Sequence, residues 1–121
     1  MERGMKRSQV WWADLGEPKG AQPGFGRPVV VVQDDLLTDS RLPTVMIVPL
    51  TSNLKRGSAI GNLLLDTRET GLTRPSVALV CQVMTIDKAL LSELAGSLGR
   101  RAMSKIDDGL RLALGLSAQR G

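Results

Sequence analysis

The chain has 121 residues and a mass of 13.0 kDa, which suits one domain with a real hydrophobic core and excludes two. Hydrophobic residues make up 42% and charged residues 23%, as in ordinary soluble globular proteins, and a net charge of +4 with a pI of about 9.8 favours a polyanionic partner. Histidine is absent and Cys81 is the only cysteine, so the composition excludes an intramolecular disulfide, gives no support to a metal site and leaves acid–base chemistry without its usual side chain.

Neither the N-terminus nor any apolar run predicts a signal peptide or a membrane span. Residues 1–9 are charged and lack an apolar signal core, and no apolar run approaches the roughly 20 residues that a membrane span needs. We therefore expect a cytoplasmic protein with a flexible N-terminal tail over residues 1–9, a single domain over residues 10–116 and a C-terminal tail over residues 117–121.

The first predicted element is a strand over Val10–Asp14 that contains two adjacent tryptophans. Side chains alternate across a strand, so Trp11 and Trp12 face opposite sides, one in the core and the other exposed or at an interface. The connector over residues 16–26 is rich in glycine and proline and long for so small a domain, which indicates a functional loop.

This loop leads into a second strand over Val29–Gln33, whose uninterrupted valines predict that both of its faces are covered. Arg27 precedes Pro28, which biases Arg27 toward extended geometry and fixes the direction of its side chain. A guanidinium in that place could bind a phosphate bidentately, or it could be a surface arginine paired with a carboxylate. Position alone leaves both interpretations open.

A third strand is predicted over Thr44–Val48, after a short helical turn that follows two aspartates. This strand ends in a turn over residues 49–53. Thr51, Ser52 and Asn53 of that turn could serve as plain turn formers or as ligands of a phosphate beside Arg27.

Further strands are predicted over Asn62–Asp66, Ser76–Val80 and Gln82–Ile86. We expect Gln82–Ile86 to continue Ser76–Val80 after a bend. Cys81 fits a small apolar residue within a strand there, because no histidine is present to activate its thiol. Gln33 and Gln82 each lie at one end of an apolar strand, and either could be a satisfied buried amide or a group that reads a base edge.

Helical periodicity appears late in the chain. Asp87 can cap a short turn over Lys88–Leu91, and a helix is predicted over Arg100–Leu114 with Gly115 as its C-terminal glycine. The apolar stripe of that helix consists of Met103, Ile106, Leu110 and Leu114. Short strands joined by turns and followed by a terminal helix predict a mainly antiparallel α+β domain and argue against a doubly wound fold.

Five segments, in order along nearly the whole chain, resemble the MazF/PemK-type toxins. They are VWWADL (10–15), RPVVVVQ (27–33), PLTS (49–52), QVMTIDK (82–88) and LRLALGL (110–116). The resemblance implies a small SH3-like barrel of antiparallel strands with a C-terminal helix, a homodimer, and metal- and cofactor-independent, sequence-specific cleavage of single-stranded RNA. It also implies a genetically linked antitoxin that blocks the RNA groove.

The resemblance implies roles for particular residues. The family's functional arginine and threonine fall on Arg27 and Thr51, which would clamp the phosphate while the 2′-hydroxyl attacks it to give a 2′,3′-cyclic phosphate and a 5′-hydroxyl. RNA contacts are then expected from the polar and aromatic residues of the neighbouring loops, namely Gln22, Phe25, Ser52, Asn53 and Gln82.

Two positions depart from the family pattern. Gln22 stands where many relatives carry a glutamate, and Met84 stands where many carry a basic residue. The alternatives are a toxin that resembles CcdB and poisons a DNA gyrase through protein contact, and an RNA-binding regulator with weakened catalysis.

Overall fold

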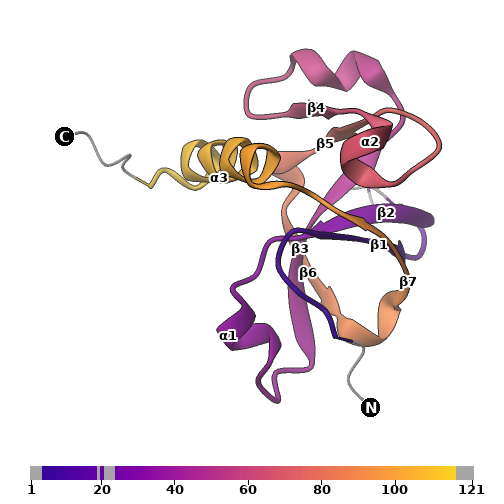
Figure 1. The fold of residues 1–121 in the computed structure, drawn as a ribbon, viewed down its shortest axis with the longest axis vertical. Helices are drawn as coiled ribbons and strands as arrows, with labels where there is room; N and C mark the ends of the chain where they lie inside the picture. The colour runs from indigo at the N-terminus through magenta and orange to yellow at the C-terminus, as the bar shows by residue number, and fades with distance from the viewer. Residues whose placement is uncertain (1–3, 19, 21–23, 117–121) are drawn as a thin grey trace.

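The computed structural model describes residues 4–18, 20 and 24–116. Seven strands, three α-helices and three short 3₁₀ helices make up the described chain (Figure 1). The strands are β1 (Gln9–Asp14), β2 (Gly26–Val31), β3 (Thr44–Thr51), β4 (Leu63–Leu65), β5 (Ser76–Ala78), β6 (Met84–Asp87) and β7 (Leu91–Ser97). The helices are α1 (Asp35–Thr38), η1 (Leu54–Ser58), α2 (Thr67–Thr70), η2 (Val80–Gln82), η3 (Lys88–Leu90) and α3 (Arg100–Leu114).

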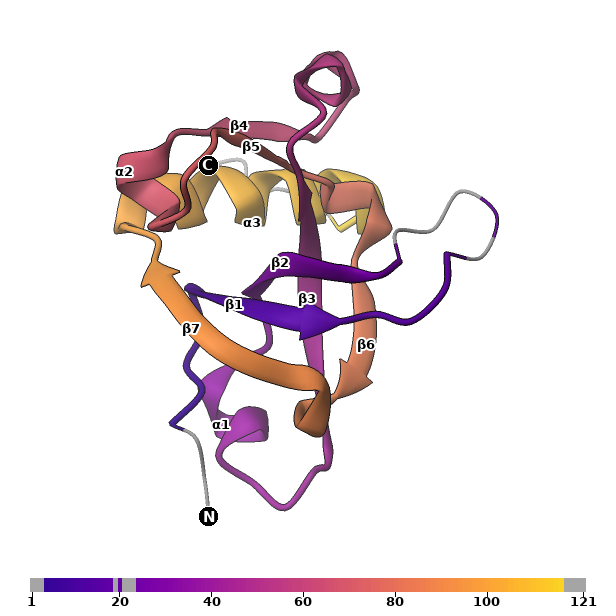
Figure 2. The ribbon, with the colours of Figure 1, turned by 90° about the vertical axis from the view of Figure 1, so that its right-hand side faces the viewer.

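The strands form one antiparallel sheet in the order β4-β5-β3-β2-β1-β7, and β6 pairs separately with β3. Figure 2 shows that the sheet is strongly curved and that α3 crosses behind β4 and β5. The architecture is therefore a mainly antiparallel half-barrel with a C-terminal helix. This confirms the predicted α+β class and excludes a doubly wound fold.

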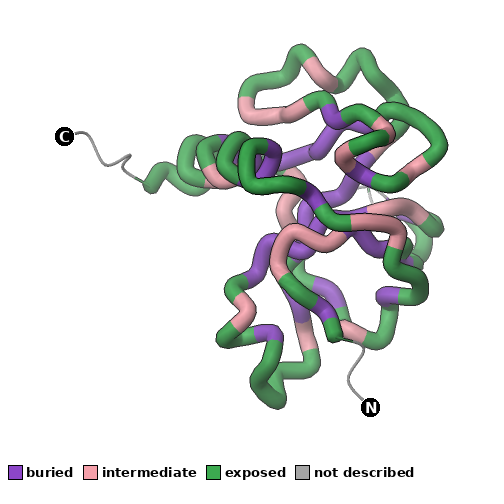
Figure 3. Tube along the Cα trace, viewed as in Figure 1, coloured by how far each residue is buried: buried purple, intermediate pink, exposed green. Residues whose placement is uncertain are grey.

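The core lies on both sides of the sheet, and β2 explains why. Val30 packs into the cluster beneath α3, whereas Val29 and Val31 pack into a second cluster inside the curl of β1, β3, β6 and β7. All three valines are fully buried, and the buried residues follow the centre of the fold in Figure 3. The prediction that both faces of this strand are covered is confirmed, because strand alternation sends successive valines into different clusters.

The predicted strands are confirmed with shifted ends, but the region after residue 78 differs. The strand predicted over Ser76–Val80 ends at Ala78, and Cys81 lies exposed in η2 rather than within a strand. η3 matches the predicted turn, although the Asp87 side chain makes no capping hydrogen bond. The chain then continues as β7, which pairs with β1 and was not predicted.

α3 begins and ends where the sequence predicts, and Gly115 ends it in the left-handed conformation with a φ of 69°. Met103 and Ile106 lie on the buried face of α3. Leu114 is 55% exposed, because the last turn of the helix extends beyond the sheet (Figure 1). Among the residues that the structure describes, no helix has the length and apolar character needed to cross a membrane.

The segment before β1 is packed, at least from residue 4 onward. Met5 is only 9% exposed, and Arg7 donates through Nε to the Val32 carbonyl at 3.0 Å and through Nη2 to Asp107 of α3. Gln9 already belongs to β1. The expectation of a flexible tail over residues 1–9 is therefore wrong for residues 4–9, and residues 1–3, like 117–121, lie outside the described residues.

Replacing Arg7 by alanine is expected to lower the free energy of unfolding by about 1–2 kcal/mol, because the half-buried guanidinium joins Val32, just after β2, to Asp107 of α3 through two hydrogen bonds. The matched control is Arg111→Ala, which removes an exposed pair with Asp108 on the same helix and should change stability by less than about 0.5 kcal/mol. Urea denaturation at one protein concentration measures both. Equal effects of the two variants would contradict a special role for Arg7.

Candidate functional site

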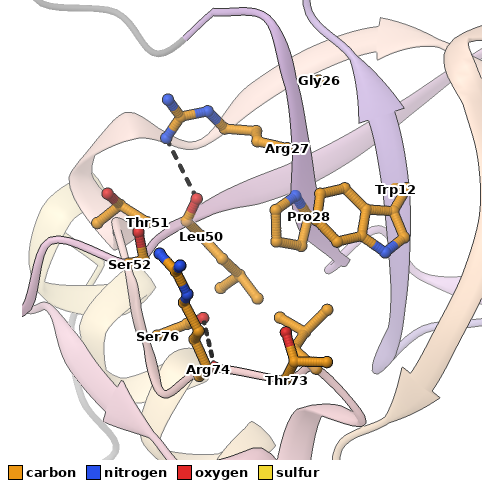
Figure 4. A pocket seen from close by; sticks show the side chains of 11 residues that line it. Trp12, Gly26, Arg27, Pro28, Leu50, Thr51, Ser52, Thr73, Arg74 and Ser76 are labelled. Carbon is orange, nitrogen blue, oxygen red and sulfur yellow. Dashed lines mark hydrogen bonds between the residues drawn. The ribbon is translucent and has the colours of Figure 1, made fainter.

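A cavity of about 350 Å³ opens between the β1–β2 hairpin, the end of β3 and the loop that leads from α2 into β5 (Figure 4). Three segments far apart in the sequence meet there because β2 pairs with β3 and β3 pairs with β5. The residues that line the cavity are Trp12, Gly26, Arg27, Pro28, Leu50, Thr51, Ser52, Leu72, Thr73, Arg74 and Ser76.

Arg27 lies near the start of β2, where it is half-buried and points across toward β3. Its Nε donates to the Gly24 carbonyl at 3.1 Å, and its Nη1 donates to the Leu50 carbonyl at 3.2 Å. These bonds use two of the five N–H donors of a guanidinium, so three remain for a ligand. The side chain is thus held in place by main-chain groups without losing its hydrogen-bonding capacity.

The charge of Arg27 is not neutralised by the cavity. Burial, and then the positive charge of Arg56, hold the pKa of Arg27 below its ordinary value. No described residue that lines the cavity carries a carboxylate, and the two partners of the Arg27 side chain are carbonyl oxygens. The interpretation of Arg27 as a surface arginine paired with a carboxylate is therefore not supported, and the environment favours an anion.

Thr51 and Ser52 bring hydroxyl groups to the wall beside Arg27 (Figure 4). Thr51 ends β3, and its Oγ1 accepts a hydrogen bond from the Asn53 amide at 3.2 Å. Because that oxygen accepts, the hydroxyl proton is free to be donated to a ligand. Asn53 itself caps η1, since its side-chain oxygen accepts from the Lys55 amide at 3.2 Å. Its amide thus has a structural role, and Asn53 does not line the cavity.

The opposite wall is apolar and includes an aromatic ring. Trp12 faces Pro28 directly across the β1–β2 pair, and Leu72 lines the same cavity. Trp12 is 39% exposed, whereas Trp11 is 5% exposed and buried in the second cluster, so the predicted division between the two tryptophans is confirmed. A single indole face beside a cation can receive a planar ring.

The predicted site residues separate into two groups. Arg27, Thr51 and Ser52 line the cavity together. Phe25 is 63% exposed at the base of the hairpin with a φ of 59° and does not line the cavity, and Gln82 lies in η2 and does not line it either. Gln22 is outside the described residues.

Two further residues discussed from sequence have structural roles. Gln33 is buried and donates through Nε2 to Thr38 Oγ1 at 3.1 Å and to the Thr44 carbonyl at 3.4 Å, so it is a satisfied buried amide. Met84 packs against the second core cluster.

The cavity also contains residues that the sequence did not single out, chiefly Thr73, Arg74 and Ser76. Arg74 precedes Pro75 ahead of β5, just as Arg27 precedes Pro28 in β2. This second arginine–proline pair was the signal available. Taken together, the site offers one fixed cation, a second arginine, hydroxyl donors and an apolar wall, which suits a phosphate attached to a planar ring.

The chain is similar to known proteins along nearly its whole length. Residues 6–114 match the family described as PemK-like, MazF-like toxin of type II toxin–antitoxin system. Endoribonuclease MazF2 of Mycobacterium bovis is 39% identical over 112 residues, which cover 93% of this chain and 98% of that protein. Endoribonuclease EndoA of Bacillus subtilis is 32% identical, over 93% of this chain and 96% of that protein.

Solved structures show the same fold. An endoribonuclease in complex with its cognate antitoxin from Mycobacterial species aligns with a TM-score of 0.78 and 23% identity, over 95% of this chain and 99% of that chain. MazF from Deinococcus radiodurans aligns with a TM-score of 0.79 and 16% identity, over 94% of this chain and 99% of that chain. The half-barrel with its C-terminal helix is thus a fold that both structures share.

Proposed function

The chain belongs to the PemK-like, MazF-like toxin family of type II toxin–antitoxin systems, and from that premise we propose that it is an endoribonuclease that cleaves single-stranded RNA in the cavity beside Arg27. The observation that carries the proposal is the guanidinium of Arg27. It is fixed by two carbonyl oxygens, keeps three free donors and faces a cavity whose described lining contains no carboxylate.

In the proposed reaction the 2′-hydroxyl of the RNA attacks the adjacent phosphorus. A bond forms between O2′ and phosphorus, the bond from phosphorus to O5′ breaks, and the products are a 2′,3′-cyclic phosphate and a 5′-hydroxyl. Negative charge grows on the phosphate oxygens in the transition state. Arg27 would stabilise that charge bidentately, and the Thr51 hydroxyl would donate to one of the same oxygens.

Proton transfer is the step with the least help from side chains. The described lining has neither imidazole nor carboxylate, and Gln22 replaces the glutamate of many relatives. In our proposal the proton of the 2′-hydroxyl therefore passes to solvent. The leaving O5′ takes a proton from Arg27, whose lowered pKa favours the donation, and solvent then returns a proton to the guanidinium, which is charged at neutral pH.

The apolar wall gives the bound nucleotide a place for its base. Trp12 presents an exposed face next to Pro28, and one stacked base contributes about 1–3 kcal/mol to binding without strong sequence preference. Sequence preference would come from RNA contacts of Gln22 and Phe25 between β1 and β2, of Ser52 and Asn53 after β3, and of Gln82 in η2.

Purified protein is expected to cleave single-stranded RNA in excess chelator, because the proposed step needs no metal. The measurement is the chemistry of the new ends. Fragments should accept a 5′-phosphate from polynucleotide kinase without prior dephosphorylation and should resist 3′-tailing until the cyclic phosphate is removed. RNAs of diverse sequence that all stay intact would overturn the proposal, and gyrase inhibition by the same sample would then favour a CcdB-like toxin.

The proposal includes the partners and the compartment in which the toxin acts. A cognate antitoxin is expected because the mycobacterial endoribonuclease of similar fold was solved in complex with one. A homodimer is supported by large apolar side chains left exposed, among them Leu64, Leu112 and Leu114, and light scattering should give twice the 13.0 kDa chain mass. The RNA substrate makes the cytoplasm the expected place of action.

A further inference from the structure

Arg74 is the second cation of the cavity. It lies in the loop between α2 and β5, is exposed, and lines the same cavity as Arg27. In Figure 4 the guanidinium of Arg27 enters from β2 and that of Arg74 enters from the loop, with Thr51 and Ser52 between them. The cavity therefore offers two guanidinium groups on different supports, each beside a hydroxyl side chain.

The loop that carries Arg74 is held at both ends. The Leu72 amide donates to Thr70 Oγ1 at 3.1 Å, and Ser76 Oγ donates to the Arg74 carbonyl at 3.4 Å. Pro75 restricts Arg74 to extended geometry, which directs its side chain away from the loop and toward the cavity. Arg74 is thus presented by a defined backbone.

The two guanidinium groups are carried by different segments of the chain. Arg27 belongs to β2 and Arg74 to the loop before β5, and Thr51 and Ser52 lie between them in the cavity (Figure 4). Each guanidinium can therefore bind an anion of its own. Within the described chain no ion pair occupies the guanidinium of Arg74, and the cavity lining supplies no carboxylate.

We propose that Arg74 binds the phosphodiester next to the one that is cleaved, so that a single nucleotide lies in the cavity with one phosphate held by Arg27 and the other by Arg74. The inference rests on the proposed RNA substrate and names a binding residue that fixes the register of the strand. Arg74 touches a phosphate that does not react. Its contact is the same in the ground state and the transition state, and its loss should weaken binding rather than chemistry.

The test measures binding separately from cleavage. The probe is a fluorescein-labelled single-stranded oligonucleotide with 2′-O-methyl groups throughout, which keeps every phosphate but has no attacking hydroxyl. The sequence of the oligonucleotide is taken from around a site at which the wild-type protein cuts RNA, or is random if the wild-type protein cuts no RNA. Anisotropy titrations over a range of salt concentrations are made for the wild type, Arg74→Ala, Arg74→Lys and the control Arg41→Ala, which removes an exposed arginine outside the cavity.

Arg74→Ala is expected to raise the Kd about tenfold and to reduce the slope of log K against log salt by about 0.7, the value for one phosphate contact on a single strand. Arg74→Lys should restore the slope and only part of the affinity, because lysine keeps the charge but lacks the planar fork. With cleavable RNA, Arg74→Ala should raise KM while kcat stays within about threefold.

The inference is overturned if Arg74→Ala keeps the slope and the Kd of Arg41→Ala, or if its kcat falls as steeply as its kcat/KM. The outcomes also separate the two proposals. A wild-type protein that cleaves RNA with a slope independent of Arg74 refutes only the second phosphate contact. A wild-type protein that leaves RNA intact but shows the Arg74-dependent slope refutes only the nuclease function.

Discussion

Replacing Arg27 by alanine is expected to lower the kcat of RNA cleavage by about 100- to 1,000-fold, the loss seen when one preorganised donor to a developing negative charge is removed. Both bonds that fix the Arg27 side chain come from backbone carbonyls that exist before substrate arrives. The guanidinium therefore needs little reorganisation during the reaction. Most of its stabilisation should appear in the transition state, where the charge on the phosphate is greatest, so kcat should fall more than KM rises.

The fold should survive this substitution, because Arg27 is half-buried and takes part in no ion pair among the described residues. Circular dichroism and the elution volume of Arg27→Ala should match those of the wild type. Arg41→Ala again serves as the charge control and should leave kcat within about threefold. If Arg27→Ala cleaves at the wild-type rate, Arg27 has no part in the chemistry, and the proposed mechanism fails.

Lysine at position 27 tests why an arginine is needed there. Arg27→Lys keeps a positive charge near the phosphate but cannot donate to Gly24, to Leu50 and to two phosphate oxygens at once. We expect it to recover KM more fully than kcat. Full recovery of kcat would show that charge alone suffices and that the bidentate geometry is unimportant.

The strands and the last helix could be predicted where local sequence and burial agree. The valines of β2 are β-formers that the fold buries on both faces, and α3 has an apolar stripe and a terminal glycine. β7 was missed because its sequence, LSELAGS, lacks β-branched residues and contains good helix formers. Its pairing with β1 imposes the extended conformation, and that is a tertiary effect which local propensity does not contain.

The site shows the same division between local and long-range information. Arg27 and Thr51 could be proposed from strand ends and from family resemblance, and both line the cavity. Arg74 could not be placed beside them, because its proximity depends on the pairing of β5 with β3. Phe25 and Gln82 lie near functional motifs in the sequence, yet the cavity lining includes neither. Closeness in sequence to a motif therefore did not predict which residues line the cavity.

Gly71 lies where α2 packs against β7, directly before the loop that lines the cavity. A substitution there should therefore affect both the free energy of unfolding and the cavity. Gly71 ends α2 with a φ of 77°, and a Cβ there would overlap the carbonyl oxygen of Ala95 and lie 3.1 Å from its carbonyl carbon. Gly96, opposite, is equally crowded, since a Cβ on it would lie 2.9 Å from the Thr70 carbonyl carbon. The obstructing atoms are backbone on both sides, so no side chain can rotate away.

Gly71→Ala is therefore expected to lower the free energy of unfolding by about 2–5 kcal/mol, from left-handed strain of about 1–2 kcal/mol and overpacking of about 1–3 kcal/mol. That is a large part of the roughly 5–15 kcal/mol that stabilises a typical domain. Urea denaturation followed by tryptophan fluorescence measures the loss at one fixed protein concentration, since association would shift the midpoint. The control is Gly57→Ala, whose Cβ would make only an ordinary 3.6 Å contact with Val77 and should change stability by no more than about 1 kcal/mol.

Because Gly71 is followed at once by Leu72, Thr73 and Arg74, relief of the clash must move the loop that forms one wall of the cavity. The folded fraction of Gly71→Ala should consequently bind the uncleavable oligonucleotide more weakly and with a smaller salt slope, as Arg74→Ala does. A variant that loses stability yet keeps wild-type affinity would show that the loop is positioned by its own hydrogen bonds and not by the glycine crossing. A variant as stable as Gly57→Ala would show that β7 and α2 can separate without cost, contrary to their packing.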